Sequence, residues 1–307
     1  MGNFHSEEMR GSMRSEMDIF LQYVKDGPDL TVDKNIVMFC GLESSKKLKG
    51  HFEKRKSQSF PTADWIKRLA EVLAGLVLDP KLAGLGALSV AITIDILSAS
   101  PDGTQKALEK VFADQKANTV WNLVDECLKR CRAYIDDGDK LRSNIGRNEV
   151  ELSAALTTLK NSMLAEKQIS SQAVRAWVNG VAFHIQMMIH LVRLGGISNY
   201  DPVTRYLTIY QKEVDQVLKQ HRVMIESKCW CKMNSEMEAF SMQPATQFLV
   251  DEDSVPHLFD DGDYDTHLKA FYEHRYGRQE SAIKQYFRDV EQNLHGLVHQ
   301  EGKFRVE

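Results

Sequence analysis

The stretch DPVTRYLTIYQKEVDQVLKQHRVMI, residues 201–225, decides the fold class of this chain. Seven of its residues step by 4, 3, 4, 3, 4 and 3 positions: Val203, Leu207, Tyr210, Val214, Val217, His221 and Met224. Such steps place side chains on one face of an α-helix, as in the seam of a coiled coil. Asp201 followed by Pro202 is a helix start, because Asp accepts bonds from free amides and proline fits the first turn. We therefore predict a long helix that runs to about residue 239.

One member of this seam is polar. His221 occupies a position that apolar side chains otherwise fill. A single polar residue in an apolar seam commonly fixes the register of the helices. A histidine buried beside a partner would also act as a pH switch, because its ordinary pKa lies close to neutral pH. Of these roles, we expect His221 to fix register.

Four other seams have the same spacing: Val120, Val124, Cys127, Cys131 and Tyr134; Leu152, Leu156, Leu159 and Met163; Val174, Val178, Val181, Ile185, Met188 and Val192; Ile283, Phe287, Val290, Leu294 and Leu297. The second and third seams lie eleven positions apart. The helix that carries them is either shifted by a four-residue stutter or broken at Ser170-Ser171. Gly195-Gly196 then ends it.

These patterns predict an all-α fold. Only 7 prolines occur in 307 residues, which leaves long stretches free to form helices, and we find no strand alternation of useful length. We expect an elongated helical bundle with coiled-coil-like heptad packing. The predicted segments are an N-terminal anchor and basic region at 1–60, a helical bundle at 61–242, an acidic connector at 243–263 and a C-terminal helix packed on the bundle at 264–307.

An apolar helical hairpin is predicted at 65–97, where Asp79-Pro80 separates its two halves. Residues 82–94 carry no charge. This run is shorter than the roughly 20 residues that a membrane-spanning helix needs. The hairpin is therefore either part of the buried core, which is the interpretation we favour, or a segment that inserts into membranes.

The charge and the cysteines limit the functional classes. The chain has 39 basic and 43 acidic residues and a net charge of −4, so it lacks the overall basic character of nucleic-acid-binding proteins. Five cysteines are an odd number, and the first 30 residues hold no secretory signal. Reduced thiols in the cytosol are expected. The spacing of the cysteines does not match a zinc knuckle, so we expect neither a metal nor a cofactor.

The first residues match a lipidation motif. Met1-Gly2-Asn3-Phe4-His5-Ser6 fits the pattern Met-Gly-x-x-x-Ser/Thr, which predicts N-myristoylation of Gly2. One myristoyl chain binds a membrane only weakly and reversibly, so stable attachment needs a second signal.

A basic cluster supplies a candidate for that second signal. It falls within eleven residues and contains Lys46, Lys47, Lys49, Lys54, Arg55 and Lys56. Each charge would contribute about 1 kcal/mol of attraction to an anionic membrane surface. The plainer alternative is a solvated connector.

No motif commits the chain to catalysis. It contains neither Gly-x-x-x-x-Gly-Lys-Ser/Thr nor Gly-x-Gly-x-x-Gly after a strand, and no serine or carboxylate has the spacing of a triad. We expect a non-enzymatic interaction or scaffold protein, attached to the cytosolic face of a membrane through Gly2 and the basic cluster. Its helix faces and the acidic stretch 251–265 would bind protein partners or a second copy. The alternative is a membrane-perturbing or pore-forming protein that uses the hairpin at 65–97.

Overall fold

The computed structural model describes residues 16–58, 64–113, 117–234, 246–259 and 263–306. The chain divides into two compact units. The larger unit consists of Leu30–Val217 and Ile283–Glu307, and the smaller one of Met1–Asp29 and Leu218–Ala282. The larger unit is thus discontinuous in sequence, because the chain leaves it after Val217 and returns to it at Ile283.

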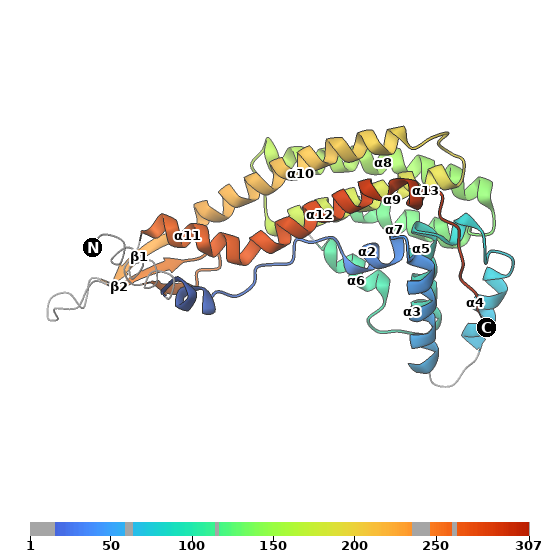
Figure 1. The fold of residues 1–307 in the computed structure, drawn as a ribbon, viewed down its shortest axis with the longest axis horizontal. Coiled ribbons are helices and arrows are strands. Elements are labelled where there is room, and N and C mark those ends of the chain that lie inside the picture. The colour runs from blue at the N-terminus through green and yellow to red at the C-terminus, as the bar shows by residue number, and fades with distance from the viewer. Residues whose placement is uncertain (1–15, 59–63, 114–116, 235–245, 260–262, 307) are drawn as a thin grey trace, which may run out of the picture. The chain divides into compact units, whose positions relative to one another are not determined.

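The larger unit is helical in the described residues. Its elements are α2 (Lys34–Cys40), α3 (Ser44–Gln58), α4 (Asp64–Leu73), η1 (Pro80–Leu82), α5 (Leu85–Leu97), α6 (Thr104–Val111), α7 (Asn118–Ala133), α8 (Gly138–Leu164), α9 (Ser171–Arg193), the first part of α10 (Asp201–Lys228), the second part of α12 (Arg278–Gln292) and α13 (Leu294–Val298). Helix α8 lies against both α7 and α9 (Figure 1).

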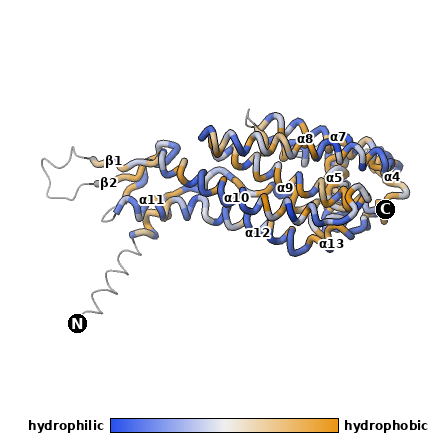
Figure 2. Tube along the Cα trace, turned by 90° about the horizontal axis from the view of Figure 1, so that it is seen from above, coloured by the Kyte–Doolittle hydropathy of each residue, from blue (hydrophilic) through white to orange (hydrophobic). Residues whose placement is uncertain are grey.

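Helix α9 forms the centre of this unit. Every residue from Ala176 to Leu191 is buried, as expected of a helix that is covered on all sides (Figure 2). Gly180 allows α8 to approach closely, because a Cβ atom there would lie 2.5 Å from Cδ2 of Leu156. The Trp177 indole Nε1 donates a hydrogen bond of 3.2 Å to the Leu156 carbonyl oxygen. The core therefore depends on close contact between these two helices.

The boundary between α8 and α9 decides one alternative that the sequence left open. Helix α8 ends at Leu164, and α9 begins at Ser171. The Ser170 hydroxyl oxygen accepts a hydrogen bond of 3.1 Å from the amide of Ala173 and so caps α9. The predicted break at Ser170-Ser171 is confirmed, and a continuous helix with a stutter is wrong. Gly195, with a φ of 69°, follows the end of α9.

The second half of the predicted apolar hairpin, α5, belongs to the core of the larger unit, whereas α4 buries only Trp65, Leu69 and Leu73. Ten of the thirteen residues of α5 are buried, and the helix contacts α2, α3, α4 and α7. Gly86 is required for this packing, because a Cβ atom there would lie 1.6 Å from the Lys81 carbonyl oxygen. Among the described helices, none combines the length and the apolar composition needed to cross a bilayer.

The smaller unit contains a sheet that the sequence analysis did not predict. Helix α10 ends at Lys228, so the predicted extension to about residue 239 is wrong. Three antiparallel strands follow in the order β1-β2-β3: β1 (Trp230–Asn234), β2 (Thr246–Val250) and β3 (Pro256–Phe259). Cys231 pairs with Leu249, and Phe248 pairs with Leu258. The partner strand β2 lies beyond residues 235–245, so local periodicity at the end of α10 does not reveal it.

The C-terminal helices differ from the single predicted helix. In the smaller unit, α11 (Tyr264–Tyr272) is followed by the π-helical turn η4 (Glu273–Gly277), and α12 then enters the larger unit. Helix α12 ends at Gln292, and Asn293 separates it from α13. The five residues of the predicted seam are all buried: Ile283, Phe287, Val290, Leu294 and Leu297. The described fold is mostly helical, which is consistent with the predicted all-α class, and it includes one small sheet that the sequence analysis did not predict.

Candidate functional site

Helix α3 presents a row of cations on its solvent-facing side. The exposed members are Lys46, Lys47, Lys49, Lys54 and Lys56. The opposite side of the helix is apolar, since Leu48 and Phe52 are fully buried. At 100° per residue, the five lysines span about half of the helix circumference. We call these five residues the lysine face.

Asp95 of α5 fixes the orientation of α3 by accepting hydrogen bonds from three side chains. Its Oδ1 lies 2.7 Å from Nε of Arg55 and 2.9 Å from Nε2 of His51, both on α3. Its Oδ2 accepts bonds of 2.7 Å from both the amide and the hydroxyl of Thr104. Because both α3 residues point toward α5, the lysines on the other side of α3 point toward solvent.

The carboxyl group of Asp95 is ionised over almost the whole pH range. Burial alone would raise its pKa, but the hydrogen bonds from His51 and Thr104 outweigh that effect and lower the pKa to about 2. The Asp95 side chain is only 4% exposed. A buried carboxylate with this pKa is a permanent negative charge that holds the two α3 side chains.

Arg55 therefore differs from the other five members of the predicted basic cluster. The sequence analysis grouped it with residues that face a membrane, but its side chain is 20% exposed and its Nε is bonded to Asp95. We correct the candidate membrane surface to the lysine face without Arg55. The sequence gives no signal for this difference, because Asp95 lies 40 residues away.

A groove beside the first turn of α3 adds a cation that the sequence analysis missed. Its volume is about 570 Å³, and Lys46, Lys49 and Lys303 are among the residues that line it. Gln300 holds the C-terminal segment in place by donating hydrogen bonds of 2.8 Å to the Leu42 carbonyl oxygen and 2.9 Å to the Ser44 hydroxyl. Lys303 lies more than 240 positions from α3 in sequence, so the cluster could not be extended to it by spacing.

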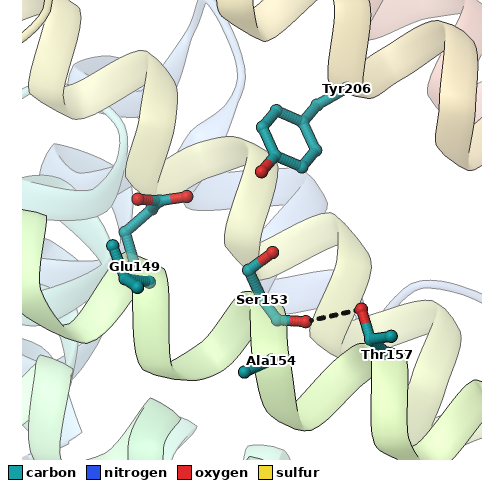
Figure 3. A pocket seen from close by; sticks show the side chains of 6 residues that line it. Glu149, Ser153, Ala154, Thr157 and Tyr206 are labelled. Carbon is teal, nitrogen blue, oxygen red and sulfur yellow. Dashed lines mark hydrogen bonds between the residues drawn. The ribbon is translucent and has the colours of Figure 1, made fainter.

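A second candidate site is a shallow pocket between α8 and α10. Its volume is about 420 Å³, and its lining includes Glu149, Ser153, Thr157 and Tyr206 (Figure 3). The Thr157 hydroxyl donates a bond of 3.0 Å to the Ser153 carbonyl oxygen. In Figure 3 the Tyr206 side chain extends from its helix toward α8, and its hydroxyl points toward the Glu149 carboxylate.

The polar groups behind this pocket are bonded to one another. His184 is fully buried, and its Nε2 lies 2.8 Å from Oε1 of Glu149. The Tyr210 hydroxyl lies 3.1 Å from Nδ1 of the same ring. Burial raises the pKa of Tyr210 above its ordinary value, so the phenol stays protonated at neutral pH and is not available as a general base. The chain Glu149–His184–Tyr210 joins α8, α9 and α10, and we assign it a structural role.

His221 and the cysteines are placed as follows. His221 is buried, with its Nδ1 3.4 Å from the Tyr272 hydroxyl. Cys127 and Cys131 are buried in α7. Within the described part of the chain, no group of three or more His, Cys, Asp or Glu side chains is positioned to hold a metal ion. Gly2, the predicted lipidation site, lies outside the described residues.

Acids of the stretch 251–265 are paired with an arginine that the sequence analysis did not single out. Arg275 is 6% exposed, and its Nε lies 3.0 Å from Oε1 of Glu252. Its Nη2 donates to Oδ2 of Asp253. The Asp251 carboxylate turns inward as well, 2.9 Å from Nε2 of His257. The side chains of Asp251 and Glu252 are therefore buried in the folded unit, while Asp253 pairs with Arg275 and stays exposed.

Comparisons with known proteins add no assignment to this geometry. No protein-family model, no curated protein and no solved structure matches the chain.

Proposed function

We propose that this chain is a non-enzymatic interaction protein that attaches peripherally to the cytosolic face of a membrane. The lysine face of α3 binds the anionic surface, and a myristoyl group on Gly2 supplies the second anchor. The observation that carries the proposal is the separation of cations on α3. Five lysines face solvent, while Arg55 and His51 are held by Asp95 on the inner side.

The two anchors contribute separate binding free energies, which add. A myristoyl chain alone gives only marginal, reversible binding. Five lysines near an anionic surface add at most about 5 kcal/mol at about 1 kcal/mol each. The exposed acids Glu43, which pairs with Lys46 and Lys47, and Glu53 reduce this sum. Lys303 lines the same groove as two of them, together with the acids Glu43 and Glu301. Leu42 also lines that groove and is 47% exposed, so it supplies an apolar contact for the lipid interface.

For protein partners, we propose the exposed faces of the long helices rather than the acidic stretch. Asp251 and Glu252 are turned toward His257 and Arg275, which leaves them poorly placed to meet a partner. We also propose that the helices pack with coiled-coil-like heptad spacing and that the chain associates with a second copy of itself.

The peripheral mode is favoured over membrane perturbation by the hairpin at 65–97. Insertion of that hairpin would require α5 to leave the core, where ten of its thirteen residues are buried. Peripheral binding through α3 requires no such rearrangement.

The proposal is tested by sedimentation of the full chain with vesicles. Myristoylated and unmodified protein are each mixed with phosphatidylcholine vesicles that contain or lack phosphatidylserine. The variant replaces the five residues of the lysine face by glutamine. We expect wild-type protein to bind anionic vesicles, with binding that falls as salt rises, and we expect the variant to lose the phosphatidylserine-dependent part.

A matched control changes the net charge equally at exposed lysines elsewhere in the larger unit: Lys106, Lys110, Lys129, Lys140 and Lys212. This control variant should bind like wild-type protein. Equal loss in both variants would show that binding follows net charge alone. Unchanged binding after loss of the lysine face would contradict the proposal.

A further inference from the structure

An apolar pocket lies between α4, α5 and the C-terminal end of α7, within the larger unit. Its volume is about 240 Å³. Its lining is mainly aliphatic and also includes Ser89, Thr93 and Arg132. The hydroxyls of Ser89 and Thr93 donate to carbonyl oxygens of their own helix, one turn back, so they are already hydrogen-bonded. The lining therefore offers mainly aliphatic carbon to a ligand.

The pocket has an apolar rim that reaches solvent. Two of its lining residues are among the large hydrophobic side chains exposed at the surface: Val72 is 47% exposed and Ile96 is 56% exposed. Its inner wall includes Leu69 and Val90, which are buried. Apolar surface that continues from a buried wall to an exposed rim is typical of a ligand site that a hydrocarbon chain can enter.

Arg132 is the charged residue of this lining. Its Nη1 is buried and has no hydrogen-bond partner among the described residues. Burial lowers the pKa of the Arg132 guanidinium below its ordinary value, and Asp125 acts in the opposite direction. Because Nη1 is covered by the chain itself, what Arg132 offers to a ligand in the pocket is its positive charge at the wall, which favours an anionic group.

The size of the pocket limits the ligand. An engineered apolar cavity of about 150 Å³ binds benzene. A pocket of about 240 Å³ holds roughly eight methylene groups if each occupies about 30 Å³, the volume of a water molecule in the liquid. An alkyl chain fits between helices where a rigid, polar ligand would leave its hydrogen-bonding groups unpaired.

We propose that this pocket binds a fatty carboxylate, with its hydrocarbon chain against the aliphatic wall and its carboxylate bonded to the Arg132 guanidinium. The charge of Arg132 selects an anionic head group, and the apolar lining selects the chain. The site is separate from the lysine face and does not depend on the proposed attachment to membranes.

Isothermal titration calorimetry of the full chain tests the site with three ligands of equal chain length. Octanoate carries the anionic head, 1-octanol is neutral, and octylammonium is cationic. We expect one molecule of octanoate to bind per chain, with an affinity at least tenfold higher than that of 1-octanol, since charge-assisted bonds are the stronger kind. Octylammonium should bind more weakly than 1-octanol, because its charge repels Arg132.

Two variants separate the head-group contact from the chain contact. Arg132→Met should weaken octanoate binding about tenfold or more and leave 1-octanol binding unchanged, which also shows that the variant is folded. Ile96→Trp should weaken both ligands by filling the mouth of the pocket. Its matched control is Leu78→Trp, since Leu78 is 57% exposed and does not line the pocket.

Three results would overturn the proposal. The first is absence of octanoate binding to the wild-type chain. The second is equal octanoate affinity in wild-type protein and Arg132→Met. The third is equal weakening of octanoate by Ile96→Trp and Leu78→Trp, because that result places the ligand elsewhere.

Discussion

Nε of Arg55 lies 2.7 Å from Oδ1 of Asp95, and this ion pair divides the cations of α3 into two groups. Arg55 attaches the helix to α5 from the inside, while its neighbour Lys54 is exposed. Adjacent residues with the same charge therefore have different roles, and substitutions can separate them.

The first prediction compares these two neighbours. Arg55→Gln should lower the free energy of unfolding by about 2 kcal/mol, the range for a hydrogen bond to a charged group. Lys54→Gln should change stability by less than about 0.5 kcal/mol. Vesicle binding should show the reverse order, with a loss of about 1 kcal/mol for Lys54→Gln. Urea denaturation and vesicle sedimentation measure the two effects, and parallel losses in both assays would contradict the division.

The second prediction concerns acid stability at Asp95. Its pKa is about 2 in the folded chain, below the ordinary value of 3.8. The unfolded chain therefore binds more protons between these values, so the stabilising contribution is complete above about pH 3.8 and is lost as the pH falls through about 2. It amounts to about 2 kcal/mol. Asp95→Asn should be less stable at pH 7 and should show a weaker loss of stability between pH 4 and 2, measured by urea midpoints.

The third prediction concerns His221, which burial keeps neutral. Burial, with a smaller contribution from Lys228, lowers its pKa from 6.5 to about 4. Because the unfolded chain takes up this proton first, the folded state should lose stability as the pH falls from about 6.5 to about 4. The total loss from this residue is roughly 3 kcal/mol.

The contribution of His221 is tested by the substitution His221→Gln. Glutamine keeps a polar side chain near the Tyr272 hydroxyl but does not titrate. The variant should show a shallower pH dependence between pH 6.5 and 4 in guanidinium titrations. His295→Gln is the control, since His295 has an exposed environment. An identical slope in wild-type protein and His221→Gln would show that other groups cause the acid sensitivity.

The fourth prediction uses two glycines that sit in helices of the same unit. Gly86→Ala should destabilise the chain by more than about 3 kcal/mol, because the new Cβ would lie 1.6 Å from the Lys81 carbonyl oxygen. Gly50→Ala in α3 should stabilise it by about 0.5 to 1 kcal/mol, since no atom lies within 4 Å of a Cβ there and alanine favours the helix. Thermal denaturation distinguishes the two, and similar effects would argue against the packing of α5 on η1.

The fifth prediction concerns the acids around Arg275. Arg275→Met should lower the free energy of unfolding by about 3 to 5 kcal/mol at pH 7, because the buried Glu252 carboxylate loses the cation that compensates its charge. Arg278→Met changes the same residue type at an exposed position three residues later and should be nearly neutral. Urea denaturation measures both variants, and an equal loss in Arg275→Met and Arg278→Met would show that the cost does not come from the buried ion pairs.

The sequence predicted the helices well where a buried face repeats in steps of three and four. The seam over residues 283–297 and the start of α10 at Asp201 are examples. It failed at β1, because the strand is stabilised by pairing with β2 beyond residues 235–245, and no local pattern reports that pairing.

The candidate site was predictable only in part, for the same physical reason. The lysines of α3 are adjacent in sequence, so their clustering is visible in the printed chain. The partners that give the site its geometry come from far away: Asp95 lies 40 residues from Arg55, and Lys303 joins from the C-terminal segment. Likewise, no spacing connects Arg132 with the pocket wall formed by α4 and α5.

Because the larger unit is discontinuous in sequence, its two segments are synthesised at different times. A ribosome completes Leu30–Val217 first. It then makes the 65 residues of Leu218–Ala282, and only afterwards the segment that begins at Ile283. Phe287 and Phe304 are fully or almost fully buried in the larger unit and arrive last. At 5–20 residues per second, the nascent core waits roughly 3 to 13 seconds for them with apolar surface uncovered. During that interval, the incompletely covered core of the larger unit is exposed to chaperones and to nascent copies of the same chain.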